Sequence, residues 1–233
     1  MAGRVKENAH NSLGTPPATG RRGARLREVA FRAIKEAILN ASLKPEFPLV
    51  EEHLASELQI SRTPVREALA ILEHEGLIEV VPYQGMFVKE VTANEFLEMY
   101  EGVGTIEPEL ARRAAAIATP DDIAAMEELL LKAEQYFPDD APRLLGACRM
   151  FQQKIGECAR NDYLTALLIT IEERSDLYLI TKWQVLPPDK LLAAINDRRA
   201  ILDAIRARDP DLAAQRSLDH ARAARLRWRD LFI

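Results

Sequence analysis

The sequence predicts a mostly α-helical chain, in which an N-terminal winged helix-turn-helix precedes an antiparallel, all-helical C-terminal bundle. Three observations support this fold class. Apolar residues recur with helical spacing from Leu26 onward. Two short β-like runs flank a turn at residues 82–85, as in a single hairpin. Every segment after Thr92 has helical periodicity, with prolines and capping residues between the segments.

The 233 residues divide into an arm and two domains. Residues 1–24 are rich in Gly, Pro, Thr, Asn and Arg and lack apolar periodicity, which indicates a disordered basic arm. We expect residues 25–91 to form the winged helix-turn-helix and residues 92–233 to form the helical bundle.

The first domain is expected to contain three helices and then the hairpin. Pro45 and Pro48 favour an extended link before the second helix. Ser61 or Thr63 is available to cap the third helix, whose first turn holds Pro64. The helices are expected at 26–40, 51–58 and from residue 61 to Gly76, and the strands at 77–81 and 86–89.

The second domain is expected to contain six helices with short joints and no fixed repeat, which is typical of a bundle. Thr119 and Asp209 each precede a proline and then an acidic residue, a combination that starts helices. Pro187 and Pro188 separate the fourth helix from the fifth. The expected spans are 93–117, 120–137, 141–160, 162–184, 188–208 and 210–231.

Bulk properties exclude several classes of protein. The longest strongly apolar stretch, residues 163–171, is too short to cross a bilayer, and the first residues contain no apolar signal core. Cys148 and Cys158 do not form a CxxC pair, so we expect two free thiols in a reducing cytoplasm. An enzyme is disfavoured because GxSxG, P-loop, GxGxxG and HExxH motifs are absent.

The net charge of −5 does not decide whether the chain binds nucleic acid. Residues 1–27 carry a charge of +5, whereas residues 28–92 and residues 93–233 carry −5 each. The basic arm suits a solubilising tail as well as contact with a phosphate backbone. We expect the acidic residues of the first domain to lie away from DNA, namely Glu51, Glu52, Glu57, Glu73 and Glu75.

The start of the third helix indicates DNA reading. Arg62, Thr63 and Arg66 share the face opposite the apolar stripe, at the end that meets base edges in a recognition helix. Arginine suits this task because its fork takes the two acceptors of guanine. A solvated charged helix start is the alternative, but the preceding helix-turn and the following hairpin favour DNA contact. The expected apolar stripe is Val65, Ala68, Leu69 and Leu72.

The segment ISRTPVREALAILEHEGLIEVVPYQGMFV resembles the DNA-binding domain of the GntR superfamily of transcription regulators, and the likeness runs over residues 26–88. Ala41 and Glu46 stand where the family usually has glycines, which puts the backbone geometry of that loop in question. The resemblance implies that Gly85 admits the wing backbone to the minor groove. The implied DNA contacts are Ser61, Arg62, Thr63, Arg66, Gln84 and Gly85.

The bundle resembles the FCD-type sensor domain of the FadR-like branch, in its six-helix variety similar to vanillate regulators. The residues that carry this likeness are Phe151, Ile155, Ala159, Asn161, Leu164, the run 199–205, Asp209 and His220. Many such domains hold a metal through one Asp and three His. The matching positions here are Cys148, Gln152, Arg198 and His220. Because a guanidinium cannot ligate a cation, we expect no structural metal and no cofactor; the alternative is zinc on Cys148 and His220 with outside ligands.

Arg198 has two interpretations. It either replaces the metal as a bidentate partner for an acidic effector, or it is an exposed helix residue beside Arg199. Val103 stands where the family often has an arginine that holds acidic ligands, which indicates a less acidic or larger effector. The candidate effector-binding residues are Arg198, His220, Cys148, Gln152 and Asn161.

These features predict a transcriptional repressor whose affinity for operator DNA is controlled by a small, carboxylate-containing effector in the C-terminal domain. We expect a homodimer on a short inverted repeat, because one recognition helix reads too few base pairs for useful specificity. The alternative is an architectural DNA-binding protein without a ligand, which would not need about 140 residues of capped helical bundle.

Overall fold

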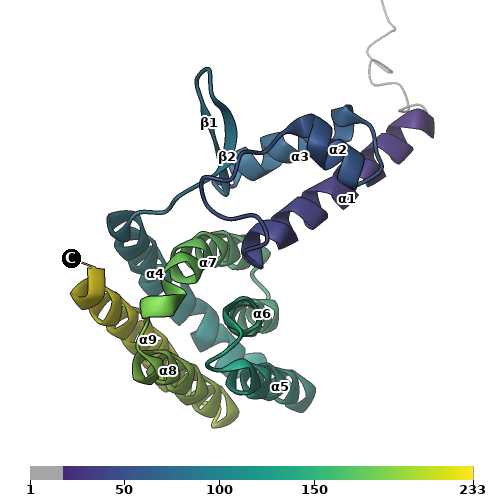
Figure 1. Ribbon diagram of the computed structural model, residues 1–233. Coiled ribbons are helices and arrows are strands. Elements are labelled where there is room, and N and C mark those ends of the chain that lie inside the picture. Colours follow the sequence, from purple (N-terminus) through teal and green to yellow (C-terminus); the bar gives the residue numbers. More distant parts are fainter. Residues whose placement is uncertain (1–17, 233) are drawn as a thin grey trace, which may run out of the picture.

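The computed structural model describes residues 18–232 and confirms the fold class, with one two-stranded sheet among the helices of this range (Figure 1). The winged-helix unit contains α1 (Ala18–Leu39), α2 (Glu51–Glu57), α3 (Arg62–His74), β1 (Ile78–Val81) and β2 (Gly85–Val88). The bundle contains α4 (Ala93–Ile117), α5 (Pro120–Tyr136), α6 (Ala141–Ala159), α7 (Asp162–Lys182), the short 3₁₀ turn η1 (Trp183–Val185), α8 (Pro188–Arg206) and α9 (Pro210–Phe232).

Helix α1 begins earlier than expected. Because it starts at Ala18, residues 18–24 of the predicted disordered arm are helical, and that part of the prediction is wrong. Residues 1–17 of the arm lie outside the described residues. Residues 22–25 are exposed and bury no apolar side chains, so hydrophobic periodicity does not mark this part of the sequence as helical. Alanine and arginine favour helix, and adding residues to an existing helix is much easier than nucleating one.

The link between α1 and α2 is extended, as the two prolines predict, and it braces the wing. The backbone N–H of Leu49 donates to the carbonyl of Met86 at 2.8 Å, and that of Glu46 donates to the carbonyl of Val88 at 2.8 Å. The strands β1 and β2 pair antiparallel, with Ile78 opposite Val88. Strand β2 is therefore hydrogen-bonded on both edges, to β1 on one and to the link on the other.

Two residues between α1 and α2 adopt a backbone conformation that usually requires glycine. Ala41 has a φ of 61° and Glu46 a φ of 60°, both in the left-handed region. An L side chain in this region costs about 1–2 kcal/mol. The departure from the family pattern thus leaves the loop geometry intact and places local strain at two positions.

The bundle helices begin and end close to the predicted residues because their local signals are strong. Thr119 accepts a hydrogen bond from the backbone of Asp122 in a capping box at the start of α5, and Asp209 caps α9 through Leu212. Helix α4 lies along α9, and α8 packs beside α9 (Figure 1). The core between these helices contains the polar groups described below.

Candidate functional site

The start of α3 presents the predicted DNA-reading residues to solvent. The apolar stripe of Val65, Ala68, Leu69 and Leu72 is fully buried, as predicted. Arg62, Thr63 and Arg66 are exposed on the opposite face, at the N-terminal end of the helix. Ser61 occupies the N-cap position and is exposed, but its side chain makes no capping hydrogen bond. Its hydroxyl is therefore not used by the helix.

Two acidic residues of α2 lie on this same face, which corrects the expectation that Glu51 and Glu52 point away from it. Glu51 accepts two hydrogen bonds from Arg66, at 2.8 Å from Nε and 2.7 Å from Nη2. Glu52 forms an ion pair with Arg62. The two hydrogen bonds to Glu51 occupy one edge of the Arg66 guanidinium and fix the orientation of its plane. The N–H donors on the other edge stay available for a DNA base.

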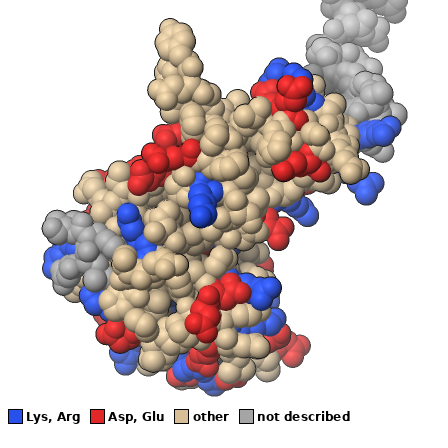
Figure 2. All heavy atoms as spheres, viewed as in Figure 1, with Lys and Arg blue, Asp and Glu red and all other residues tan. Residues whose placement is uncertain are grey.

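The wing projects from the winged-helix unit away from the bundle (Figure 1). Gln84 and Gly85 are exposed in it, and Gly85 has a φ of 115°, a backbone conformation that L residues rarely adopt. Figure 2 shows that the projecting part carries no charged side chain, in agreement with the uncharged sequence of residues 80–88. Acidic and basic side chains are intermixed on the rest of this face, which shows no continuous basic patch.

A narrow pocket in the bundle brings together three of the five predicted effector residues. Arg198 of α8, His220 of α9 and Cys148 of α6 all line it. Arg198 is 5% exposed, so its interpretation as a surface residue is wrong. Its neighbour Arg199 is the outward-facing residue and pairs with Glu134 of α5. The pocket has a volume of about 30 Å³, enough for a water molecule but not for an organic effector.

Arg198 faces a carboxylate that the sequence did not reveal. Glu172 of α7 lies 4.0 Å from it, measured between Nη2 and Oε2, and is 2% exposed. Nη1 of Arg198 donates to the carbonyl of Ala194 at 3.2 Å, whereas its Nε has no hydrogen-bond partner in the described part of the chain. A second acid, Asp176 of α7, also lines the pocket and pairs with Arg149 of α6.

The other two predicted effector residues do not line the pocket. Asn161 caps helix α7, where its side chain accepts a hydrogen bond from the backbone of Leu164 at 3.1 Å, so its role is structural. Gln152 is fully buried one turn beyond Cys148 on α6, next to Glu107 and Ser217. These positions do not bring Asn161 and Gln152 to the pocket with Arg198, so their predicted role in effector binding gains no support from the structure.

Glu107 of α4 is a buried carboxyl without a cationic partner of its own. Its pKa is raised to about 8, mainly by burial and also by nearby Glu172, while Arg198, Gln152 and Ser217 oppose the rise. Its carboxyl oxygens form no hydrogen bond of good geometry with described residues. Glu107 is therefore mostly protonated and uncharged at neutral pH.

The residues at the family's metal positions do not fit a divalent ion. The Arg198 guanidinium lies among them, and it repels a cation and cannot ligate one. Burial raises the pKa of the Cys148 thiol, which disfavours the thiolate that zinc needs. Burial and the charge of Arg198 lower the pKa of His220 to about 4, so its imidazole is neutral and able to ligate, but one such ligand beside a guanidinium does not make a metal site. Among the described residues, no group of three or more His, Cys, Asp or Glu side chains is placed to hold a metal.

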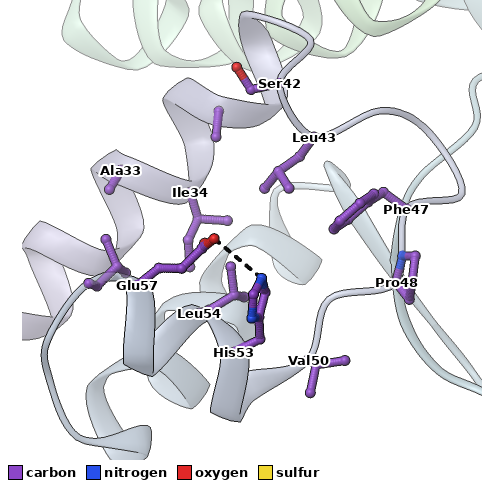
Figure 3. Close-up of a pocket in the computed structure, with 12 residues that line it drawn as sticks. Ala33, Ile34, Ser42, Leu43, Phe47, Pro48, Val50, His53, Leu54 and Glu57 are labelled. Carbon is purple, nitrogen blue, oxygen red and sulfur yellow. Dashed lines mark ion pairs between the residues drawn. The ribbon is translucent and has the colours of Figure 1, made fainter.

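A second, more open cavity lies in the winged-helix unit between α1, the following loop and α2 (Figure 3). It has a volume of about 350 Å³ and a mainly apolar lining that includes Ile34, Phe47 and Leu54. His53 and Glu57 of α2 also line it and lie against each other, with Nε2 and Oε1 3.2 Å apart. None of the residues that line it is a buried polar group, so we do not assign the effector to it.

Helix α7 connects the pocket with the winged-helix unit. Glu172 and Asp176 face the pocket, whereas Glu173, between them, pairs with Lys35 of α1 at 2.7 Å from Nζ to Oε2. The same Lys35 ammonium lies 2.9 Å from Glu75, which follows α3. Successive side chains of α7 thus contact the pocket on one side and the DNA-reading unit on the other.

In the part of the chain from 18 to 232, no helix is long and apolar enough to cross a membrane. Comparison with known proteins agrees with both domain resemblances. Residues 26–88 match the bacterial regulatory proteins of the gntR family, and residues 98–223 match the FCD domain.

Relatives and solved structures match this chain over most of its length. The HTH-type transcriptional regulator McbR of Escherichia coli K12 is 29% identical over 183 residues, which cover 76% of this chain and 81% of McbR. The HTH-type transcriptional repressor RspR of the same organism is 26% identical over 195 residues, which cover 82% and 83%. A solved structure of E. coli McbR has a TM-score of 0.78 at 24% identity and covers 89% of this chain and 99% of its own. The chain belongs to the GntR family of bacterial transcription regulators that carry a C-terminal FCD domain.

Proposed function

We propose that the protein is a repressor, without enzymatic activity, that leaves its operator when a carboxylate-containing effector binds beside Arg198. The observation that carries this proposal is the buried Arg198 guanidinium, which lines a pocket and has an unpartnered donor among the described residues. A buried charged donor of this kind is costly unless a ligand or another group satisfies it. The DNA partner would place the protein in the cytoplasm.

Helix α7 supports the control of DNA binding by the effector. A carboxylate that binds Arg198 competes with Glu172, and a shift of Glu172 moves the segment that holds Glu173 against Lys35. Arg174, the next residue, packs against Gly76 at the end of the recognition helix, since a Cβ atom there would lie 3.2 Å from its Nε. If residues 172–174 adopt two arrangements, the α3 helices of the two subunits would lie at two different separations. Coupling between two binding sites requires a two-state element of this kind.

We expect a homodimer that selects a compact inverted repeat. Selection of sequences from a random DNA pool, followed by light scattering of the protein with and without the selected DNA, measures both properties. The expected result is a dimer in both states and a two-fold symmetric site, because each subunit contributes one recognition helix. A monomer bound to an asymmetric site would contradict the proposal.

A further inference from the structure

The effector pocket is electrically balanced before any ligand enters. Arg198 and Glu172 form one buried pair, in which Glu172 has a side chain 3% exposed. Arg149 and Asp176 form a second pair, in which the Asp176 side chain is 5% exposed. Each buried cation beside the pocket already has a carboxylate neighbour. Burial raises the pKa of Glu172, and the charges of Arg198 and Arg149 oppose that rise. With Glu172 ionised, the wall offers no uncompensated positive charge to an anion.

The other ionisable groups around the pocket add no positive charge either. The imidazole of His220 is neutral at pH 7, since burial and Arg198 hold its pKa at about 4. Asp197, beside it, pairs with Arg227 at 2.5 Å from Oδ2 to Nη2. The carboxyl of Glu107 is mostly protonated, with its pKa raised by burial to about 8. A simple carboxylate effector would therefore add one buried, unbalanced negative charge, which is unfavourable.

The gap between Arg198 and Glu172 has a free donor on one side and a free acceptor on the other. Their separation of 4.0 Å is longer than a hydrogen bond. Arg198 Nε and Glu172 Oε1 are both buried without a hydrogen-bond partner among the described residues. A ligand that satisfies both needs an acceptor for the guanidinium and a donor for the carboxylate.

The rest of the pocket wall is mostly apolar. Helices α4, α6, α7, α8 and α9 all contribute residues to it. This wall favours an apolar group attached to the polar end of the ligand. The apolar side chains that line the pocket include Leu144, Leu145, Leu179, Leu191, Ile195 and Trp228.

We propose that the effector is a zwitterion with an apolar side chain, of the amino-acid class, whose carboxylate binds Arg198 and whose ammonium group binds Glu172. This inference rests on the proposed function, since it names the chemistry of the same pocket. The zwitterion keeps the pocket neutral and satisfies both unpartnered atoms. Its entry separates α8 from α7 at this point, because the closed pocket of about 30 Å³ does not hold it.

Matched ligands test the proposal on the full-length protein by isothermal titration calorimetry. Valine, leucine and phenylalanine are each compared with the corresponding desamino acid and the corresponding decarboxylated amine. The expected result is that at least one amino acid binds at least about tenfold more tightly than both of its truncated analogues, a difference of about 1.4 kcal/mol.

Two variants identify the groups responsible. In Glu172→Gln we expect the preference to reverse: the amino acid weakens about tenfold or more, and the desamino acid gains affinity because it now supplies the counter-ion of Arg198. In Arg198→Met both acids lose binding. The matched controls are Arg199→Met and Glu134→Gln, the adjacent outward-facing pair, which should bind all compounds as the wild type does.

The wild-type comparison decides the proposal even if Glu172→Gln folds poorly. If the desamino acids bind wild-type protein as tightly as the amino acids, and Arg198→Met abolishes that binding, the zwitterion inference fails while the carboxylate effector stands. If none of the amino acids binds, the zwitterion inference fails, and the effector proposal is judged separately by whether compounds that stabilise the protein change its affinity for the operator.

Discussion

Glu107→Gln is expected to raise the free energy of unfolding by about 3 kcal/mol at pH 7. Burial raises the pKa of Glu107 to about 8, whereas the unfolded chain has a value near 4.5. Between these two pH values the native state keeps a proton that the unfolded state releases, so wild-type stability falls as pH rises through this window. Glutamine has nearly the same shape and carries no such cost, and the pKa difference at pH 7 corresponds to about 3 kcal/mol.

Urea denaturation of the variant and the wild type at several pH values checks this result. The gain should shrink to about 1 kcal/mol at pH 5, because this pH is only about half a unit above the unfolded pKa and keeping the proton in the native state then costs little. The control Glu109→Gln changes an exposed residue two positions away that pairs with Arg113, and should change stability by less than about 0.5 kcal/mol. Comparing each variant with the wild type at the same pH also removes the opposite contribution of His220, which lowers stability below about pH 6.5. A gain of equal size at pH 5 and pH 8 would refute the assigned protonation of Glu107.

Arg66→Ala is expected to abolish operator selectivity. A base-reading arginine contributes about 1–3 kcal/mol at its base pair, and a symmetric dimer uses it twice, so the operator should lose about 2–6 kcal/mol. Affinity for unrelated DNA should fall much less, because that binding depends on phosphate contacts. The side chain is exposed and its partner Glu51 is near the surface, so the fold should tolerate the change.

Fluorescence anisotropy with the selected operator and a scrambled duplex measures this selectivity. Arg113→Ala is the matched control, since it removes an exposed arginine with a glutamate partner on α4 of the other domain. It should leave both affinities unchanged. Wild-type selectivity in Arg66→Ala would mean that α3 is not the recognition helix.

The sequence predicts most of this fold because the decisive signals are local. Helical periodicity, the cap at Thr119 and the prolines that begin α5 and α9 each act within a few residues. The sequence predicts too short a helix α1, because residues 22–25 bury no apolar side chains and hydrophobic periodicity therefore does not include them.

The site was only partly predictable because its ion pairs join residues far apart in the chain. Glu51 meets Arg66 from another helix, and Glu172 meets Arg198 across the bundle. Helix α7 also buries polar residues on one face, so its apolar periodicity gives no sign that Glu172 points inward. The resemblance to the FCD family indicated that Arg198, His220 and Cys148 lie near one another, and all three line the pocket. It did not indicate Glu172, the counter-ion of Arg198, which only the packed structure reveals.

The central claim, that a ligand at Arg198 controls DNA binding, is tested most directly by operator affinity in the presence of ligand. The full-length protein is titrated onto the selected operator with and without each compound that raises its thermal stability. We predict that at least one such compound weakens operator affinity about tenfold or more in the wild type and in Arg199→Met, and leaves Arg198→Met unchanged. Operator affinity that no stabilising compound alters, or an equal response in Arg198→Met, would contradict the account.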